Sequence, residues 1–159
     1  MNNTVKFSIF SLIITAAVII LSVAGIVSVR HNTEEVVIGC LIVGAVVIAG
    51  LYYCPVSVEA NRSEIKLHRF LAKPKVFAYK DIASVDTCYP SAGGIRLCGS
   101  GGCFGYWGYF SDIMIGTYFG YYGSRSSCFL VRLNNGRQYV LGCENPVAMV
   151  DYIKTYIAR

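Results

Sequence analysis

Residues 7–29 read FSIFSLIITAAVIILSVAGIVSV and hold no charged side chain in twenty-three positions. Residues 36–54, VVIGCLIVGAVVIAGLYYC, form a second uncharged run of nineteen. As a helix, each run is long enough to cross the roughly 30 Å hydrocarbon core of a bilayer. Because only six residues separate the runs, we expect two antiparallel transmembrane helices that form a hairpin within residues 1–54.

The first run has a second interpretation, a secretory signal peptide, because Lys6 precedes it and Ser22-Val23-Ala24 is an acceptable cleavage site. Its twenty-three residues exceed the roughly 7 to 15 residues of a signal core, and another apolar run follows at once. We therefore favour the transmembrane hairpin.

The composition agrees with a membrane anchor, because 55% of the residues are hydrophobic and 14% are charged, against about 25% charged in soluble domains. Residues 7–54 hold three charges, Arg30, Glu34 and Glu35, and none lies inside an apolar run. Charged groups inside spans mark ion and proton paths in transporters and channels. Their absence from both runs argues against these two classes.

The orientation of the hairpin follows from the basic residues close to the runs. The loop carries Arg30 alone, whereas the outer ends carry four basic residues, Lys6, Arg62, Lys66 and Arg69. Loops rich in Lys and Arg stay in the cytoplasm. We expect an anchor in the cytoplasmic (inner) membrane, with both termini and residues 55–159 on the cytoplasmic side.

Residues 55–159 have the size of one domain, and their patterns predict strands followed by one helix. Apolar and polar residues alternate at 56–59 and 65–70, and the Asn-Gly pair at 135–136 is typical of a tight hairpin turn. Asn145-Pro146 is typical of a helix start, and apolar residues at helical spacing extend that helix to Arg159. Further short strands are expected at 76–79, 83–85, 128–133 and 138–141. This order favours an antiparallel sheet or barrel capped by a C-terminal helix.

Residues 89–127 contain ten of the sixteen glycines and the only tryptophan. We expect glycine at tight turns and close backbone approaches, and aromatic rings that supply buried area. The segment has no lysine and no phosphate-binding G-x-x-x-x-G-K-[ST] motif, which argues against nucleotide binding. Its central aromatic residues have two interpretations: they lie in the membrane interface, or they fill the barrel and form a self-association surface. These residues are Phe104, Tyr106, Trp107, Tyr109 and Phe110.

Residues 55–159 resemble the bacterial pleckstrin-homology-like (PH-like) domains that follow an N-terminal transmembrane hairpin. The resemblance is carried by Tyr79–Val85, by the aromatic and glycine residues of 105–110 with Gly116 and 118–122 behind them, and by Asn134-Asn135-Gly136 leading into Asn145-Pro146. It implies a bent barrel of about seven antiparallel strands, closed at one end by the C-terminal helix. Such barrels serve as scaffolds for lipid, peptide and self-association sites.

A basic stretch begins eight residues after the second run and is opposed locally by Glu64 alone. A domain tethered so closely stays near the anionic leaflet, where each basic residue contributes about 1 kcal/mol. The stretch is therefore a candidate lipid or anion site; the alternative is a solvated strand face that serves as a topology signal. Leu67 and His68 separate two of the cations, unlike the alternating signature of phosphoinositide-binding relatives. The candidate residues are Arg62, Lys66, Arg69, Lys73 and Lys75.

Seven cysteines raise the possibility of metal binding or nucleophilic catalysis, but Cys98-x4-Cys103 lacks an accompanying C-x2-C pair and His68 is the only histidine after residue 54. We predict that the cysteines act as small buried hydrophobes, without metal or cofactor. Nucleic-acid binding is disfavoured because residues 97–124 contain no cation among their aromatics.

These observations predict a membrane-anchored, non-catalytic interaction or scaffold module that binds a protein partner or itself. The alternative is a module that binds anionic lipid head groups through its first, basic hairpin. An enzyme that uses cysteine or a metal is a third and weaker hypothesis.

Overall fold

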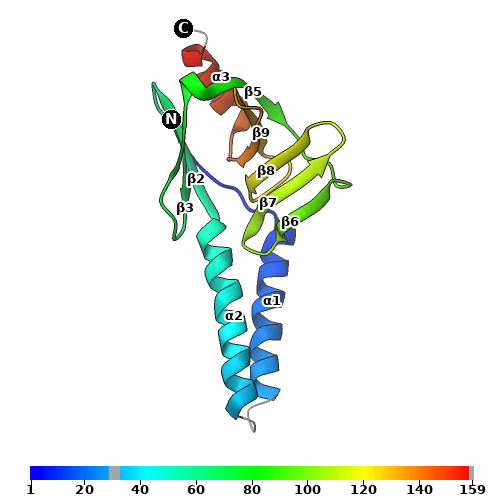
Figure 1. Cartoon of the computed structure of the whole chain (residues 1–159). Helices are drawn as coiled ribbons and strands as arrows, with labels where there is room; N and C mark the ends of the chain where they lie inside the picture. The colour runs from blue at the N-terminus through cyan, green and yellow to red at the C-terminus, as the bar shows by residue number, and fades with distance from the viewer. Residues whose placement is uncertain (29–32, 158–159) are drawn as a thin grey trace.

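The computed structural model describes residues 1–28 and 33–157. Two apolar helices, α1 (Ile9–Ser28) and α2 (Thr33–Tyr53), lie side by side and project from one end of a β-rich region (Figure 1). Both are long and apolar enough to cross a membrane, with mean hydropathies of 2.7 and 2.5. The predicted helix pair is confirmed, and its apolar surface suggests membrane association. The loop with Arg30 lies outside the described residues.

A short strand that the sequence did not predict, β1 (Asn2–Thr4), precedes α1. It pairs with β2 (Pro55–Ala60), which begins just after α2, and the Val5 amide donates to the Val56 carbonyl at 2.9 Å. The strand therefore ties the chain before the first helix to the chain after the second. Its Asn-Asn-Thr sequence has no apolar alternation, so only the backbone pairing reveals it.

The first sheet has the order β1-β2-β3-β4, with β3 (Glu64–Arg69) and β4 (Lys75–Ala78) continuing the predicted basic hairpin. A short 3-10 helix, η1 (Tyr79–Asp81), leads to the second sheet, whose order is β5-β9-β10-β8-β7-β6. Its strands are β5 (Ile82–Cys88), β6 (Ile95–Gly102), β7 (Gly105–Asp112), β8 (Gly116–Tyr122), β9 (Cys128–Leu133) and β10 (Gln138–Gly142).

The sheets differ from the expected barrel of about seven antiparallel strands. The described residues form ten strands in two sheets that do not close into a barrel, and one pair, β8 with β10, is parallel. The sequence patterns missed β6, β7 and β8 because glycine interrupts their apolar alternation. Strand order is a long-range property, so local patterns could not predict the parallel pair.

Glycines form a row across the second sheet, where Gly99 pairs with Gly108 and Gly108 pairs with Gly120. Gly99 and Gly108 have φ of 120° and 122°, and a Cβ on either would stand 2.1 Å from a carbonyl oxygen on the facing strand. Only glycine tolerates such a conformation and approach. The prediction of glycine at close backbone approaches is confirmed, and the row lets the backbones of β6 and β7 approach each other closely.

Helix α3 (Pro146–Ile157) closes the β-rich region, and Asn145 caps it by accepting from the Ala148 amide at 3.2 Å. Met149, Val150 and Ile153 are buried against apolar residues from both sheets, which form the main core. A second core, with Tyr106, Phe110 and Tyr122, lies on the opposite face of the second sheet. The predicted C-terminal helix is confirmed as far as Ile157, and residues 158–159 lie outside the described residues.

Candidate functional site

The domain has a helix-proximal end, where α1 begins and α2 ends, and the turn between β6 and β7 contacts the helices there (Figure 1). The Ser11 hydroxyl donates to the Gly102 carbonyl at 2.5 Å, and the Phe104 amide donates to the Thr15 hydroxyl at 2.9 Å. The Phe104 ring covers Gly50 of α2, where a Cβ would stand 2.3 Å from the ring. The turn is therefore bound to both helices about two turns into α1.

The polar residues of α1 that make these contacts were not predicted as site residues, although their spacing in the sequence is a signal. Ser11 and Thr15 are four positions apart, which places them on one face of a helix. Ser11 is 1% exposed. Polar side chains on one face of an otherwise apolar helix indicate an internal partner, which here is the turn of residues 102–105.

The structure divides the five central aromatic residues among different environments. Trp107 stacks on Tyr53 of α2, with ring centroids 4.9 Å apart, and its indole N–H donates to the Cys103 carbonyl at 3.2 Å. Tyr106 and Phe110 are buried in the second core, whereas Tyr109 is 53% exposed. Phe104 and Trp107 thus contact α2 or adjoin it, Tyr106 lines a cavity with Phe10 of α1, and Tyr109 and Phe110 do not share that position.

The five basic candidate residues are likewise divided. Arg69, Lys73 and Lys75 belong to a helix-proximal loop (residues 69–75), whose Phe70 amide donates to the Cys54 carbonyl at 3.1 Å, directly after α2. Arg62 lies at the other end of the hairpin, in the turn between β2 and β3. Lys66 is in mid-strand and its ammonium is 3.0 Å from the Glu64 carboxylate. The structure does not bring the five together.

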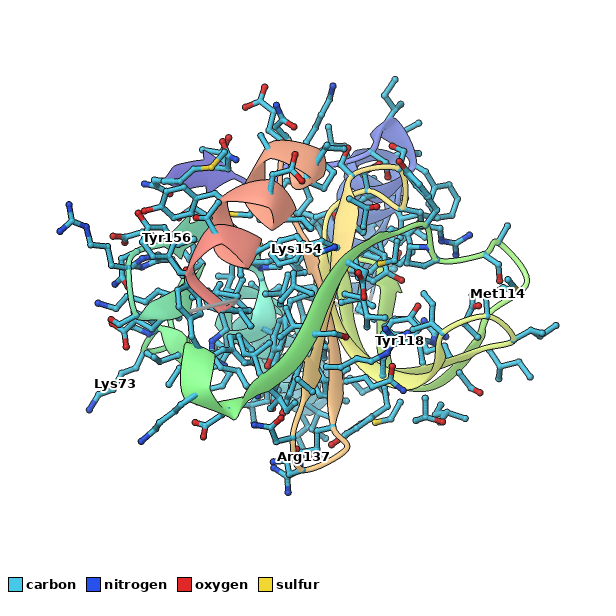
Figure 2. The ribbon with its side chains drawn as sticks, turned by 90° about the horizontal axis from the view of Figure 1, so that it is seen from above. Lys73, Met114, Tyr118, Arg137, Lys154 and Tyr156 are labelled. Carbon is cyan, nitrogen blue, oxygen red and sulfur yellow. The ribbon has the colours of Figure 1, made fainter. Side chains whose placement is uncertain are left out.

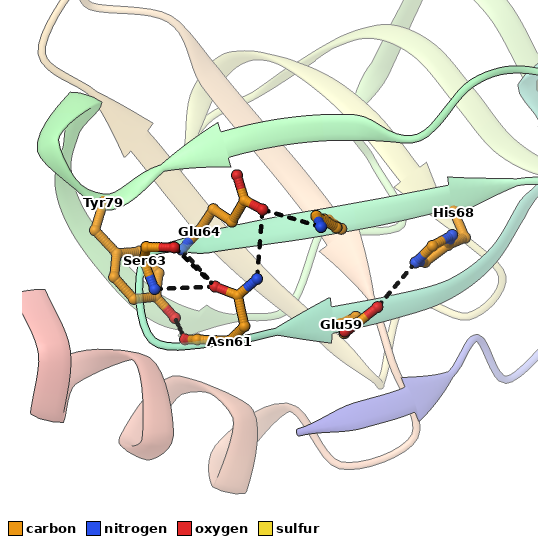
Figure 3. Close-up of polar contacts among 7 residues, drawn as sticks. Glu59, Asn61, Ser63, Glu64, His68 and Tyr79 are labelled. Carbon is orange, nitrogen blue, oxygen red and sulfur yellow. Dashed lines mark hydrogen bonds and ion pairs between the residues drawn. The ribbon is translucent and has the colours of Figure 1, made fainter.

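The part of the hairpin that is far from the helices has its polar groups engaged with one another (Figure 3). Asn61 accepts from the amides of Ser63 and Glu64 at 2.9 Å, and the Tyr79 hydroxyl donates to the Asn61 carbonyl at 2.7 Å. The hydrogen bond between the Lys66 ammonium and the Glu64 carboxylate lowers the pKa of Glu64 and raises the pKa of Lys66. We interpret this network as structural, because it defines the hairpin turn.

Two of the three cations of the helix-proximal loop, Arg69 and Lys75, lie over aromatic rings instead. The Lys75 ammonium is 4.3 Å from the ring centroid of Tyr139 and within 6 Å of three other rings. The Arg69 guanidinium is 5.5 Å from the Tyr52 ring and 6.0 Å from the Tyr121 ring. Burial raises the pKa of Tyr121 to about 12, although Arg69 opposes this. Each cation–π contact contributes about 0.5–1 kcal/mol at such sites.

No carboxylate of the described residues lies within ion-pair distance of Arg69, Lys73 or Lys75. The loop also exposes two apolar side chains, with Phe70 62% and Leu71 56% exposed. The Arg69 guanidinium donates to the Lys73 carbonyl at 2.6 Å, so what the three cations lack is a carboxylate partner. Exposed apolar groups flanked by cations without a carboxylate partner match the chemistry of a membrane surface, which offers hydrocarbon beneath anionic head groups.

Two further cations at this end were not predicted as site residues. Lys6 is exposed three positions before α1, and the Arg125 guanidinium lies 5.1 Å from the Tyr106 ring in a cavity that Ser8 also lines. In the sequence, Lys6 indicated only the orientation of the helix pair. Arg125 is isolated in sequence, so nothing local connects it to the basic hairpin.

The cysteines are free, and no group of three or more potential metal ligands occurs among residues 1–28 and 33–157. Cys88, Cys128 and Cys143 are buried, as predicted, and burial raises the pKa of each thiol. A protonated thiol is a poor nucleophile and metal ligand. The prediction was wrong for Cys98, which is exposed on β6, whereas Cys40 lies on the outer surface of the apolar helix α2.

Comparisons with protein-family models, with curated proteins and with solved structures found no match to this chain. The resemblance to PH-like domains therefore stays a prediction, and the candidate site stands on geometry alone.

Proposed function

We propose that this chain is a membrane-anchored, non-catalytic binding module whose helix-proximal loop contacts anionic lipid head groups. In this proposal α1 and α2 span the cytoplasmic membrane, and the β-rich region lies on its inner face with both termini in the cytoplasm. The excess of basic residues at the outer ends of the helices supports this orientation.

One observation carries the proposal: Arg69, Lys73 and Lys75 lack a carboxylate partner and flank exposed Phe70 and Leu71 next to the end of α2. A loop held there cannot leave the membrane surface when α2 spans the bilayer. At about 1 kcal/mol for each cation near an anionic surface, the three contribute about 3 kcal/mol together.

Hydrogen exchange of the full chain in lipid nanodiscs tests the proposal. We expect slower exchange of the amides in residues 70–73 when phosphatidylglycerol replaces a third of the phosphatidylcholine. The variant with Arg69, Lys73 and Lys75 all changed to Gln should lose this difference. A control variant, Arg137→Gln, removes a cation from the exposed turn between β9 and β10 and should keep it. Equal exchange in both lipid compositions would contradict the proposal.

The resemblance to PH-like domains belongs to the proposal too. Two packed sheets with a C-terminal helix against the core support it, whereas the open sheets and the parallel β8–β10 pair depart from the expected barrel. We propose a PH-like relationship in which the glycine-rich strands β6, β7 and β8 are enlarged to reach the helices.

A second candidate function, binding of a protein or of a second copy, is favoured by an apolar surface on the other side of the domain. In the turn between β7 and β8, Ile113 is 99% and Met114 is 87% exposed, and Ile95 of the edge strand β6 is 66% exposed. Figure 2 shows Met114 and Lys73 at opposite sides of the domain. Unpaired edge strands with exposed apolar residues are common association surfaces.

The mass of the detergent-solubilised full chain, measured by light scattering, tests self-association. We expect a dimer that Ile113→Asp with Met114→Asp converts to a monomer, while Val147→Asp, at an exposed position of α3, leaves it intact. A monomeric parent chain would rule out self-association at this surface.

A further inference from the structure

A groove of about 280 Å³ runs between α2 and the hairpin of β6 and β7. Val46, Ala49 and Gly50 of α2 form one wall, and Phe104 and Trp107 form the other. The volume is near the lower end of ligand pockets, which hold about 300–1,000 Å³. The groove is thus large enough for part of a lipid and too small for a whole one.

The walls of the groove are apolar, and the groove is continuous with the exposed side of α2, where Val46 is 50% and Ile42 is 60% exposed. Two side-chain donors in the groove are already used, because the Ser100 hydroxyl and the Trp107 indole N–H both donate to the Cys103 carbonyl. Water needs several polar partners to occupy such a space. A hydrocarbon chain suits it better.

One cation lines the groove. The Arg96 side chain extends towards Gly101 of the same strand, and its Nη1 atom is 3.1 Å from the position that a Cβ would take at Gly101. The absence of a side chain at Gly101 makes room for the guanidinium. In the part of the chain that the structure describes, Arg96 has no ion pair or side-chain hydrogen bond. A guanidinium with its donors unused is suited to bind a phosphate through two hydrogen bonds.

We propose that this groove binds one anionic phospholipid, with an acyl chain against Val46 and Ala49 and the phosphate on Arg96. The inference rests on the membrane placement proposed above, but it uses no residue of the helix-proximal loop. The groove would hold a single lipid selected by its charge, whereas the loop contacts the leaflet surface at large.

The only tryptophan of the chain, Trp107, lines the groove and reports on its occupant. We would reconstitute the full chain in nanodiscs that carry brominated chains on either phosphatidylglycerol or phosphatidylcholine, at equal mole fractions. Quenching of Trp107 should show a preference of about fivefold for phosphatidylglycerol, the effect of one cation at an anionic surface. Equal quenching by the two lipids, or none by either, would overturn the proposal.

Variants separate the groove from the loop. Arg96→Gln should abolish the preference, and Ala49→Phe, which fills the groove, should reduce quenching by both lipids. Arg137→Gln is the matched control and should behave as the parent chain. The variant without the three loop cations should keep the preference for phosphatidylglycerol. Quenching therefore tests the groove alone and hydrogen exchange tests the loop alone, so that either proposal can fail without the other. A preference that persists in Arg96→Gln would refute the role of Arg96.

Discussion

The glycine row of the second sheet makes a prediction whose magnitude follows from the structure. Gly108 has φ of 122° and a Cβ there would stand 2.1 Å from the Cys98 carbonyl oxygen, on backbone that cannot rotate away. Gly108→Ala therefore adds backbone strain of about 1–3 kcal/mol and a clash that forces β6 and β7 apart. We expect a loss of more than about 3 kcal/mol in the free energy of unfolding, which is above the common range for a single substitution.

Two control substitutions separate the contribution of backbone strain to this loss of stability from the contribution of the clash with the facing strand. Gly136→Ala meets nothing within 4 Å but keeps φ of 79°, so strain alone should cost about 1 kcal/mol. Gly93→Ala meets nothing and carries no positive φ, so we expect almost no change. Denaturant unfolding of the β-rich region in detergent, followed by near-ultraviolet circular dichroism, measures all three variants. A cost at Gly108 equal to that at Gly136 would show that the close approach does not matter and would refute the reasoning.

Three other predictions concern single groups. The Asp112 carboxylate accepts hydrogen bonds from the Ser91 hydroxyl and amide and from the Met114 amide, which lower its pKa. Asp112→Asn should therefore lower the free energy of unfolding in urea by about 1–3 kcal/mol at pH 7. Because the folded-state pKa is depressed, that stabilisation is present above the unfolded value and is lost as the pH falls through the folded one, so the two chains should converge in acid. Burial raises the pKa of Tyr79, Tyr118 and Tyr121 to about 12, so absorbance at alkaline pH should show that these three tyrosines ionise late. The free energy of unfolding should decline between about pH 10 and pH 12, because in this range the three tyrosines ionise only in the unfolded chain. Ionisation of all tyrosines at about pH 10 would contradict the buried positions of these three. If the domain is cytoplasmic, a membrane-impermeant maleimide should label exposed Cys98 only after the cells are permeabilised. Cys98→Ser is the control, and labelling of Cys98 in intact cells would contradict the proposed orientation.

The candidate site was only partly predictable from the sequence. The basic stretch is visible because its members are close along the chain, yet only Arg69, Lys73 and Lys75 lie at the helix-proximal end. A β-hairpin places alternate parts of a stretch at opposite ends, so Arg62 is carried away to the far turn. Arg96 and Arg125 reach the same end of the domain from distant strands and loops, and no local pattern links them to it.

The sequence alone determined the helix pair, the first and last β-hairpins and the C-terminal helix. Each of these follows from local chemistry: uninterrupted apolar length, alternation, an Asn-Gly turn and an Asn-Pro start. Tertiary structure decided how the glycine-rich strands pair, which strands lie parallel, and how the turn at Phe104 packs on Gly50. These depend on contacts between residues far apart in the chain, and glycine, which has no side chain, leaves no pattern from which such contacts could be predicted.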